Sequence, residues 1–101
     1  MNRETVLQNK IRCALSDYGI VIRLNTGFFL TADNRMVKCG IPGMPDLLFL
    51  GPSGQTVWLE VKTATGIVSE AQNRFIARLR ELGHTAEVVR SVDEALVLVG
   101  K

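Results

Sequence analysis

One predicted β-hairpin constrains the fold of this chain more than any other segment. Two strand-like runs, 46–50 and 56–62, flank a short loop at 51–55 that holds two glycines and a proline. Strands joined by so short a loop pair antiparallel, and the length of the loop sets their register. Here it pairs Leu50 with Thr56.

The same register places Asp46 directly opposite Glu60. Cross-strand partners have Cβ atoms roughly 4.5–5.5 Å apart, and side chains alternate faces along a strand. Asp46, Glu60 and Lys62 therefore share one face at the end of the hairpin. Two carboxylates about 5 Å apart repel by roughly 3 kcal/mol at an effective dielectric constant near 20, so a proton, a basic partner or a metal must relieve them. This arrangement is typical of a site for a hard divalent cation.

Simpler interpretations of these residues remain open at this point. Asp46 follows a proline and could be a turn residue, while Glu60 and Lys62 could face solvent or form a salt-bridge cluster with Asp46. Trp58 shares their face, however, and the opposite face of the strand is apolar. A strand with apolar residues on both faces is covered at least in part, so charged side chains at its end would be partly buried. Partial burial of charge needs a structural or functional explanation.

Length and composition indicate one folded domain over residues 1–101, with 47% hydrophobic residues and only three prolines. No run approaches 18 uninterrupted apolar residues, and the first residues lack the apolar stretch of a signal peptide. These features predict a soluble, cytoplasmic protein with no membrane association. Cys13 and Cys39 lack the close spacing of a zinc or redox motif and are expected to be buried free thiols.

The net charge of +2 permits a nucleic-acid partner without establishing one. If three carboxylates are occupied by metal, the remainder carries 12 − (10 − 3) = +5. Eight of the twelve basic residues are arginine, which suits bidentate phosphate contacts. An ordinary solvated surface explains the same numbers.

The other expected elements follow from hydrophobic periodicity and from capping and turn residues. The first is a helix over about 3–17, whose inward residues are Leu7, Ile11, Ala14, Leu15 and Tyr18. A strand at 20–24 follows, and then two short strands at 28–30 and 36–38 that turn at 33–34. After the hairpin come a helix that opens at 69–72, a strand at 85–89 and a last short helix after Ser91; the inward residues of the two helices are Phe75, Ile76, Leu79 and Leu82, and then Val92, Ala95, Leu96 and Val99. The order α-β-β-β-β-β-α-β-α predicts an α/β fold, a mixed β-sheet flanked by helices.

A series of motifs in this order resembles a known family. The segments are Glu4 to Gln8, Gly40-Ile41-Pro42-Gly43-Met44-Pro45-Asp46-Leu47, Trp58-Leu59-Glu60-Val61-Lys62, Ser69-Glu70-Ala71-Gln72 and Val88-Val89-Arg90. Pro-Asp followed by Glu-x-Lys resembles the signature of the PD-(D/E)xK nucleases, and the whole series resembles a stand-alone VRR-NUC domain. The resemblance implies a restriction-endonuclease-like core and spans nearly the whole chain.

Carried over by position, the resemblance implies Asp46 and Glu60 as catalytic, metal-binding carboxylates, with the carbonyl of Val61 as a further ligand. Lys62 would orient or deprotonate the attacking water and offset charge at the scissile phosphate. The implied cofactor is Mg²⁺ or Mn²⁺.

Three further residues are implied in the site. Glu4 would bind the metal directly or through water, and Gln8, one helical turn later, would support it by hydrogen bonding. Glu4 could equally be a first-turn acid that favours the helix dipole. Gln72 completes a capping box with Ser69, yet it also lies on the inner face of its helix, where the resemblance favours a catalytic role.

The expected function is that of a metal-dependent DNA endonuclease. The family resemblance implies a homodimer that acts on branched DNA such as a four-way (Holliday) junction. The alternatives are a catalytically idle nucleic-acid-binding module and a nuclease of flap or nicked DNA. A metabolic α/β protein would need a phosphate-cradling glycine loop, which Gly40 to Gly43 does not match. The sequence singles out no DNA-contacting residue.

Overall fold

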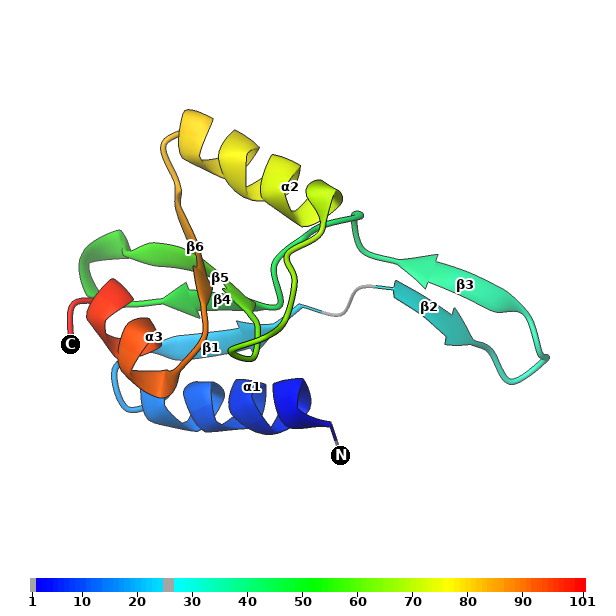
Figure 1. The fold of residues 1–101 in the computed structure, drawn as a ribbon, viewed down its shortest axis with the longest axis horizontal. Coiled ribbons are helices and arrows are strands. Elements are labelled where there is room, and N and C mark those ends of the chain that lie inside the picture. The colour runs from blue at the N-terminus through cyan, green and yellow to red at the C-terminus, as the bar shows by residue number, and fades with distance from the viewer. Residues whose placement is uncertain (1, 25–26) are drawn as a thin grey trace.

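The computed structural model describes residues 2–24 and 27–101 and has the predicted order of elements. In chain order they are α1 (Arg3–Leu15), β1 (Ile20–Arg23), β2 (Gly27–Leu30), β3 (Met36–Cys39), β4 (Leu47–Leu50), the 3₁₀ turn η1 (Pro52–Gly54), β5 (Thr56–Val61), α2 (Glu70–Glu81), β6 (Thr85–Val89) and α3 (Val92–Leu98). The expected α/β fold, a mixed sheet flanked by helices, is confirmed (Figure 1).

The central sheet has the strand order β1-β4-β5-β6. β4 pairs antiparallel with both β1 and β5, whereas β5 and β6 are parallel. Leu50 pairs with Thr56, as the loop length predicted. β5 is thus an inner strand, and its carboxyl end lies beside the beginning of β4 and the carboxyl end of β6.

Helices cover both faces of this sheet, with α2 on one side and α1 on the other (Figure 1). One core cluster joins α1 and α3 to the sheet through Ile11, Leu15, Leu59, Val61 and Ala95. A smaller cluster joins α2 to the sheet through Ile76, Leu79 and Ala86. Because side chains alternate along β5, Leu59 packs in the first cluster and Trp58 packs against the second. The charged residues Glu60 and Lys62 lie at the carboxyl end of the strand.

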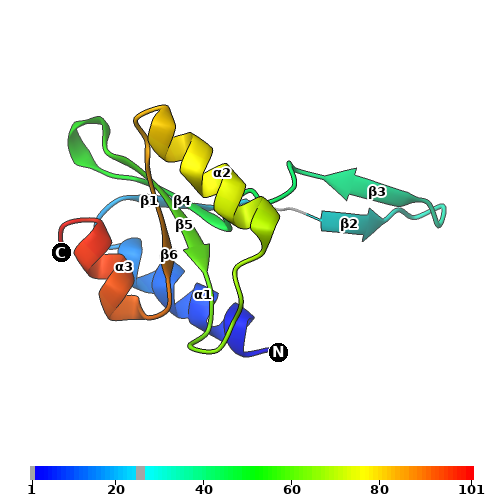
Figure 2. The same ribbon diagram turned by 45° about the horizontal axis from the view of Figure 1, so that its top comes forward.

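β2 and β3 form a hairpin of their own and do not join the central sheet. Figures 1 and 2 both show this hairpin extending away from the rest of the molecule. The N–H of Leu24, just after β1, donates to the carbonyl of Asp46, just before β4, so the hairpin lies between two chain positions that meet at Asp46.

Three details differ from the sequence-based expectation. Tyr18 lies beyond the end of α1 and is exposed under the Lys101 ammonium, and Leu82 follows α2 and is exposed as well. Cys13 is a free thiol, but it is exposed because it lies on the outer face of α1. The side chain of Cys39 lies outside the described residues. No described helix has the length and apolar character needed to cross a bilayer.

Candidate active site

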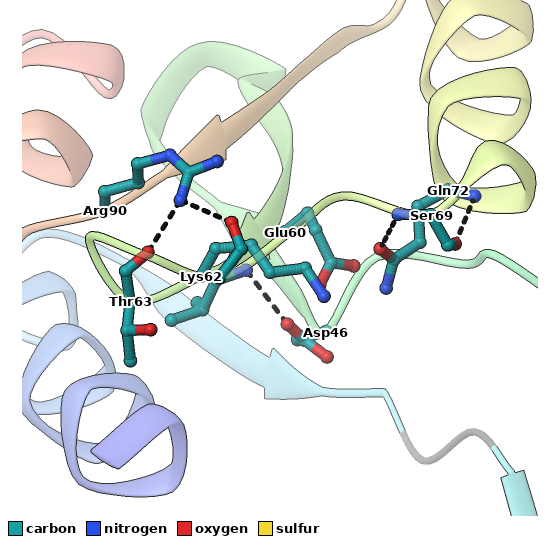
Figure 3. Close-up of polar contacts among 9 residues, drawn as sticks. Asp46, Glu60, Lys62, Thr63, Ser69, Gln72 and Arg90 are labelled. Atoms are coloured by element: carbon teal, nitrogen blue, oxygen red, sulfur yellow. Dashed lines mark hydrogen bonds and ion pairs between the residues drawn. The ribbon is translucent and has the colours of Figure 1, made fainter.

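Asp46 is fixed at the mouth of the β4–β5 hairpin by its backbone and by its side chain. Its carbonyl accepts a hydrogen bond from the Leu24 N–H at 2.7 Å, which continues the β1–β4 pairing by one residue. Its Oδ2 accepts from the Val61 N–H at 2.9 Å (Figure 3). The carboxylate of Asp46 is thus bound to the last residue of β5, across the hairpin, and the pairing of Leu47 with Leu59 brings Asp46 opposite Glu60 as the loop length predicted.

Glu60 lies beside Asp46 and is 1% exposed. Neither oxygen of its carboxylate has a hydrogen-bond partner among the described residues. The Lys62 ammonium lies 3.8 Å from Oε2, inside the range of an ion pair and too long for a hydrogen bond. A buried carboxylate with no hydrogen-bond donor is costly, so Glu60 needs a proton or a cation in addition to Lys62.

α1 brings two more polar side chains to the same place. Asn2 caps the helix by accepting from the Thr5 N–H, and this sets Glu4 in the first turn. Oxygen atoms of Glu4, Asp46 and Glu60 all lie within 4.8 Å of one another. Gln8, one turn later, is buried, and its Oε1 lacks a hydrogen-bond partner in the part of the chain that is described. Glu4 therefore lies in a cluster of three acids, and its role as a metal ligand stays a prediction.

The electrostatics of the cluster concentrate on Glu60. Burial raises the pKa of its carboxyl from 4.5 to about 9, and the negative charges of Asp46 and Glu4 act in the same direction. Lys62 opposes the rise without cancelling it. The lysine alone is thus insufficient to hold Glu60 ionised at neutral pH. A divalent cation, by contrast, would stabilise all three carboxylates as anions.

These residues fit the divalent metal that the sequence predicted. Hard cations such as Mg²⁺ and Mn²⁺ take oxygen ligands, and the site gathers three carboxylates together with the unpartnered amide oxygen of Gln8. The Val61 peptide also lies here, because its N–H is bound to Asp46. Whether its carbonyl binds a metal stays a prediction.

The loop before Asp46 packs against the first turn of α2, and Gly43 makes this possible. Gly43 has φ +82°, and a Cβ there would lie 2.3 Å from the Ala71 carbonyl oxygen and 2.9 Å from the Gln72 nitrogen. Only glycine fits both the backbone angle and the close approach. The start of α2 is therefore held near the loop that carries Asp46.

Gln72 forms the expected capping box. Its backbone N–H donates to Ser69 Oγ at 3.1 Å, and its side-chain Oε1 accepts from the Ser69 N–H at 2.9 Å. Figure 3 shows the side chain on the side of α2 that faces Glu60. The capping function is thus observed, and the catalytic function of Gln72 stays a prediction.

Arg90 has a place near the site that the sequence did not reveal, although the residue lies in the Val-Val-Arg motif. Its Nη1 donates to the carbonyl oxygens of Thr63 at 2.6 Å and Gly66 at 2.8 Å (Figure 3). These residues form the turn that follows Lys62. No periodicity or spacing signals a contact between positions so far apart in the sequence.

Comparisons with known proteins agree with this geometry. The VRR-NUC domain model matches residues 2–93. A solved structure described as a VRR-NUC domain superposes with a TM-score of 0.73 at 25% sequence identity, covering 98% of this chain and 96% of that chain. No match is found among the curated proteins.

A mixed sheet with Asp46 opposite Glu60, and with Lys62 two residues later, defines the class of PD-(D/E)xK nucleases. Within that class, the chain belongs to the VRR-NUC family. Membership implies nuclease activity, with DNA as the substrate.

Proposed function

We propose that this protein is a divalent-metal-dependent DNA endonuclease that acts as a homodimer on branched DNA, with four-way junctions as the preferred substrate. The buried carboxylate of Glu60 supports metal dependence most strongly, since it accepts no hydrogen bond from the described residues and lies within 4.8 Å of the acidic oxygens of Glu4 and Asp46. A fold that needed only packing at this position would gain stability from an apolar residue there.

In this proposal Glu4, Asp46 and Glu60 hold the metal, with the Val61 carbonyl and Gln8 in support. Mg²⁺ or Mn²⁺ would supply Lewis-acid chemistry, lowering the pKa of a water molecule and neutralising charge on the phosphate. The fit rests on the oxygen-only donor set and on Gln8 and Glu60, whose buried side-chain oxygens accept no hydrogen bond within the described part of the chain.

The protein's own contribution centres on Lys62, whose side chain is 12% exposed. Lys62 would orient the attacking water or, as the neutral amine, take its proton, and as the ammonium it would offset the charge that develops on the non-bridging oxygens. In hydrolysis the water oxygen forms a new bond to phosphorus, a bridging P–O bond breaks, and the leaving oxygen takes up a proton. Gln72 would orient the carboxylates or the water through its amide, in addition to capping α2.

The β2–β3 hairpin supports the dimer. An isolated two-stranded hairpin is marginally stable in water, yet this one stands apart from the central sheet. Leu30 and Met36 are cross-strand partners on it and are 64% and 65% exposed. We define these two side chains as the hairpin patch. A second copy would cover the patch and would place two active sites on one branched substrate.

The proposal is tested by incubating the purified protein with labelled four-way junction, flap, single-stranded and linear duplex DNA, in Mg²⁺, Mn²⁺ or EDTA. We expect metal-dependent cleavage that is fastest on the junction. Asp46→Ala should abolish cleavage while DNA binding persists, because the variant loses a ligand and a negative charge. Binding without cleavage by the unaltered protein in either metal would favour an idle binding module. Faster cleavage of the flap would favour the second alternative.

A further inference from the structure

We propose that Arg90 is a positioning residue for Lys62: it fixes the turn 63–66, whose backbone in turn supports the lysine side chain. This inference rests on the proposed function, because Lys62 acts in the same reaction. It adds a residue that need not touch the DNA, the metal or the water.

The first link joins Arg90 to the turn. One guanidinium nitrogen, Nη1, donates to two carbonyl oxygens, of Thr63 at 2.6 Å and of Gly66 at 2.8 Å. Hydrogen bonds from a charged donor are shorter and stronger than neutral ones. The turn has one further bond of its own, from the Gly66 N–H to the Thr63 carbonyl at 3.1 Å. Arg90 therefore joins this turn to the end of β6 through two side-chain hydrogen bonds.

The second link holds Arg90 itself in place. Its backbone N–H donates to Glu94 Oε1 at 2.7 Å, and Glu94 is fixed by the α3 cap, where its N–H donates to Ser91 Oγ. The preceding residue, Val89, accepts from the Lys62 N–H at 3.1 Å. The ends of β5 and β6 and the start of α3 thus form a rigid base for the guanidinium.

The third link joins the turn to the lysine. A Cβ built on Gly66 would lie 3.4 Å from both Cβ and Cδ of Lys62, so the side-chain position of Gly66 faces the aliphatic part of the lysine. The Nζ atom at the end of the same side chain lies 3.8 Å from Glu60 Oε2. The turn limits the rotamers of a long side chain that would otherwise leave the site.

Loss of Arg90 should therefore affect the chemical step. A reacting group displaced by about 1 Å can cost on the order of 100-fold in rate. We expect Arg90→Ala to lower kcat at least tenfold, with KM and Mn²⁺ affinity within twofold of the unaltered protein. Arg90→Lys keeps a charged donor without the planar guanidinium and should recover part of the loss. Arg78→Ala, at an exposed arginine of α2 paired with Glu81, is the matched control.

Unchanged kcat in a folded Arg90→Ala variant would overturn the inference. So would a raised KM with a shallower salt dependence, which is the behaviour of an arginine that contacts a phosphate.

NMR relaxation of the lysine Cε groups provides a readout that does not depend on cleavage. In protein labelled with ¹³C-lysine, the Lys62 signal, assigned with Lys62→Arg, should be more ordered than that of exposed Lys10. Arg90→Ala should bring the order of Lys62 close to that of Lys10, and no change would refute the positioning role. If the unaltered protein does not cleave DNA, the proposed function fails, while this measurement still decides whether Arg90 orders Lys62.

Discussion

Replacing Glu60 by glutamine should stabilise the metal-free protein at neutral pH. The folded protein raises the pKa of this carboxyl from 4.5 to about 9 by burying it beside Asp46 and Glu4, so at pH 7 it folds in the protonated form. One pKa unit corresponds to 1.36 kcal/mol, and pH 7 is 2.5 units above the ordinary value of 4.5. Protonating Glu60 thus costs about 3 kcal/mol of folding free energy at pH 7. Glutamine has nearly the same shape and carries no such cost.

The sign of the pH dependence follows from the direction of the shift. Because the folded pKa is raised, the contribution of Glu60 is most favourable below pH 4.5 and is lost as the pH rises towards 9. The variant and the unaltered protein should therefore have similar stability at pH 4. At pH 7 the variant should gain up to about 3 kcal/mol, or roughly 10 °C or more in Tm for a domain of this size.

Thermal and urea unfolding in EDTA, at pH 4 and pH 7, measure this difference. Glu81→Gln, at an exposed glutamate paired with Arg78, is the matched control and should change stability by less than about 1 kcal/mol. Mg²⁺ should then stabilise the unaltered protein and leave Glu60→Gln almost unchanged. Loss of stability in Glu60→Gln at pH 7 would refute the reasoning, because it would mean that Lys62 already satisfies an ionised Glu60 in a simple salt-bridge cluster.

Three further predictions concern the chemistry and the assembly. Lys62→Ala should slow cleavage by roughly 10²–10⁴-fold, the range for a positioned acid–base group. Lys62→Arg should recover little of this rate, because guanidinium is never a base. An Arg variant with normal kcat would mean that Lys62 has a purely electrostatic role. Gln72→Glu should keep the Tm of the unaltered protein, because glutamate preserves the capping box. The rate of cleavage should fall at least tenfold. If the cleavage rate is also unchanged, Gln72 is only a cap. Light scattering should detect a dimer of the unaltered protein at micromolar concentration. The double variant Leu30→Glu, Met36→Glu, which places charge on the exposed hairpin patch, should be a monomer. A monomer in the unaltered protein would remove the dimer from the proposal.

The hairpin of the active site could be predicted from the sequence because its geometry is local. A five-residue loop fixes the pairing of Leu50 with Thr56, and the alternation of side chains then brings Asp46 to Glu60. The capping box of α2 and the Ser91 cap of α3 are local for the same reason. The position of Glu4 came instead from the family resemblance, since nothing local tells which face of the sheet α1 covers.

Contacts between distant segments were not predictable in this way. A strand pattern does not state all its partners, so the turn at 33–34 predicts that 28–30 and 36–38 pair with each other but not that they stand apart from the central sheet. The bonds from Arg90 to Thr63 and Gly66 depend on how the ends of β5 and β6 meet. The exposure of Tyr18 and Leu82 has a simpler cause, because each follows the last helical residue and no longer keeps the helical period.

The central claim is that Glu4, Asp46 and Glu60 together hold the metal on which cleavage depends. Anomalous diffraction from crystals soaked in Mn²⁺ tests it most directly, because it locates the ion without reference to any assumed ligand. The account predicts a peak bound by oxygen atoms of these three residues, within the cluster whose oxygens now lie within 4.8 Å of one another. A Mn²⁺ peak elsewhere, in protein that cleaves DNA in the same metal, would contradict the account.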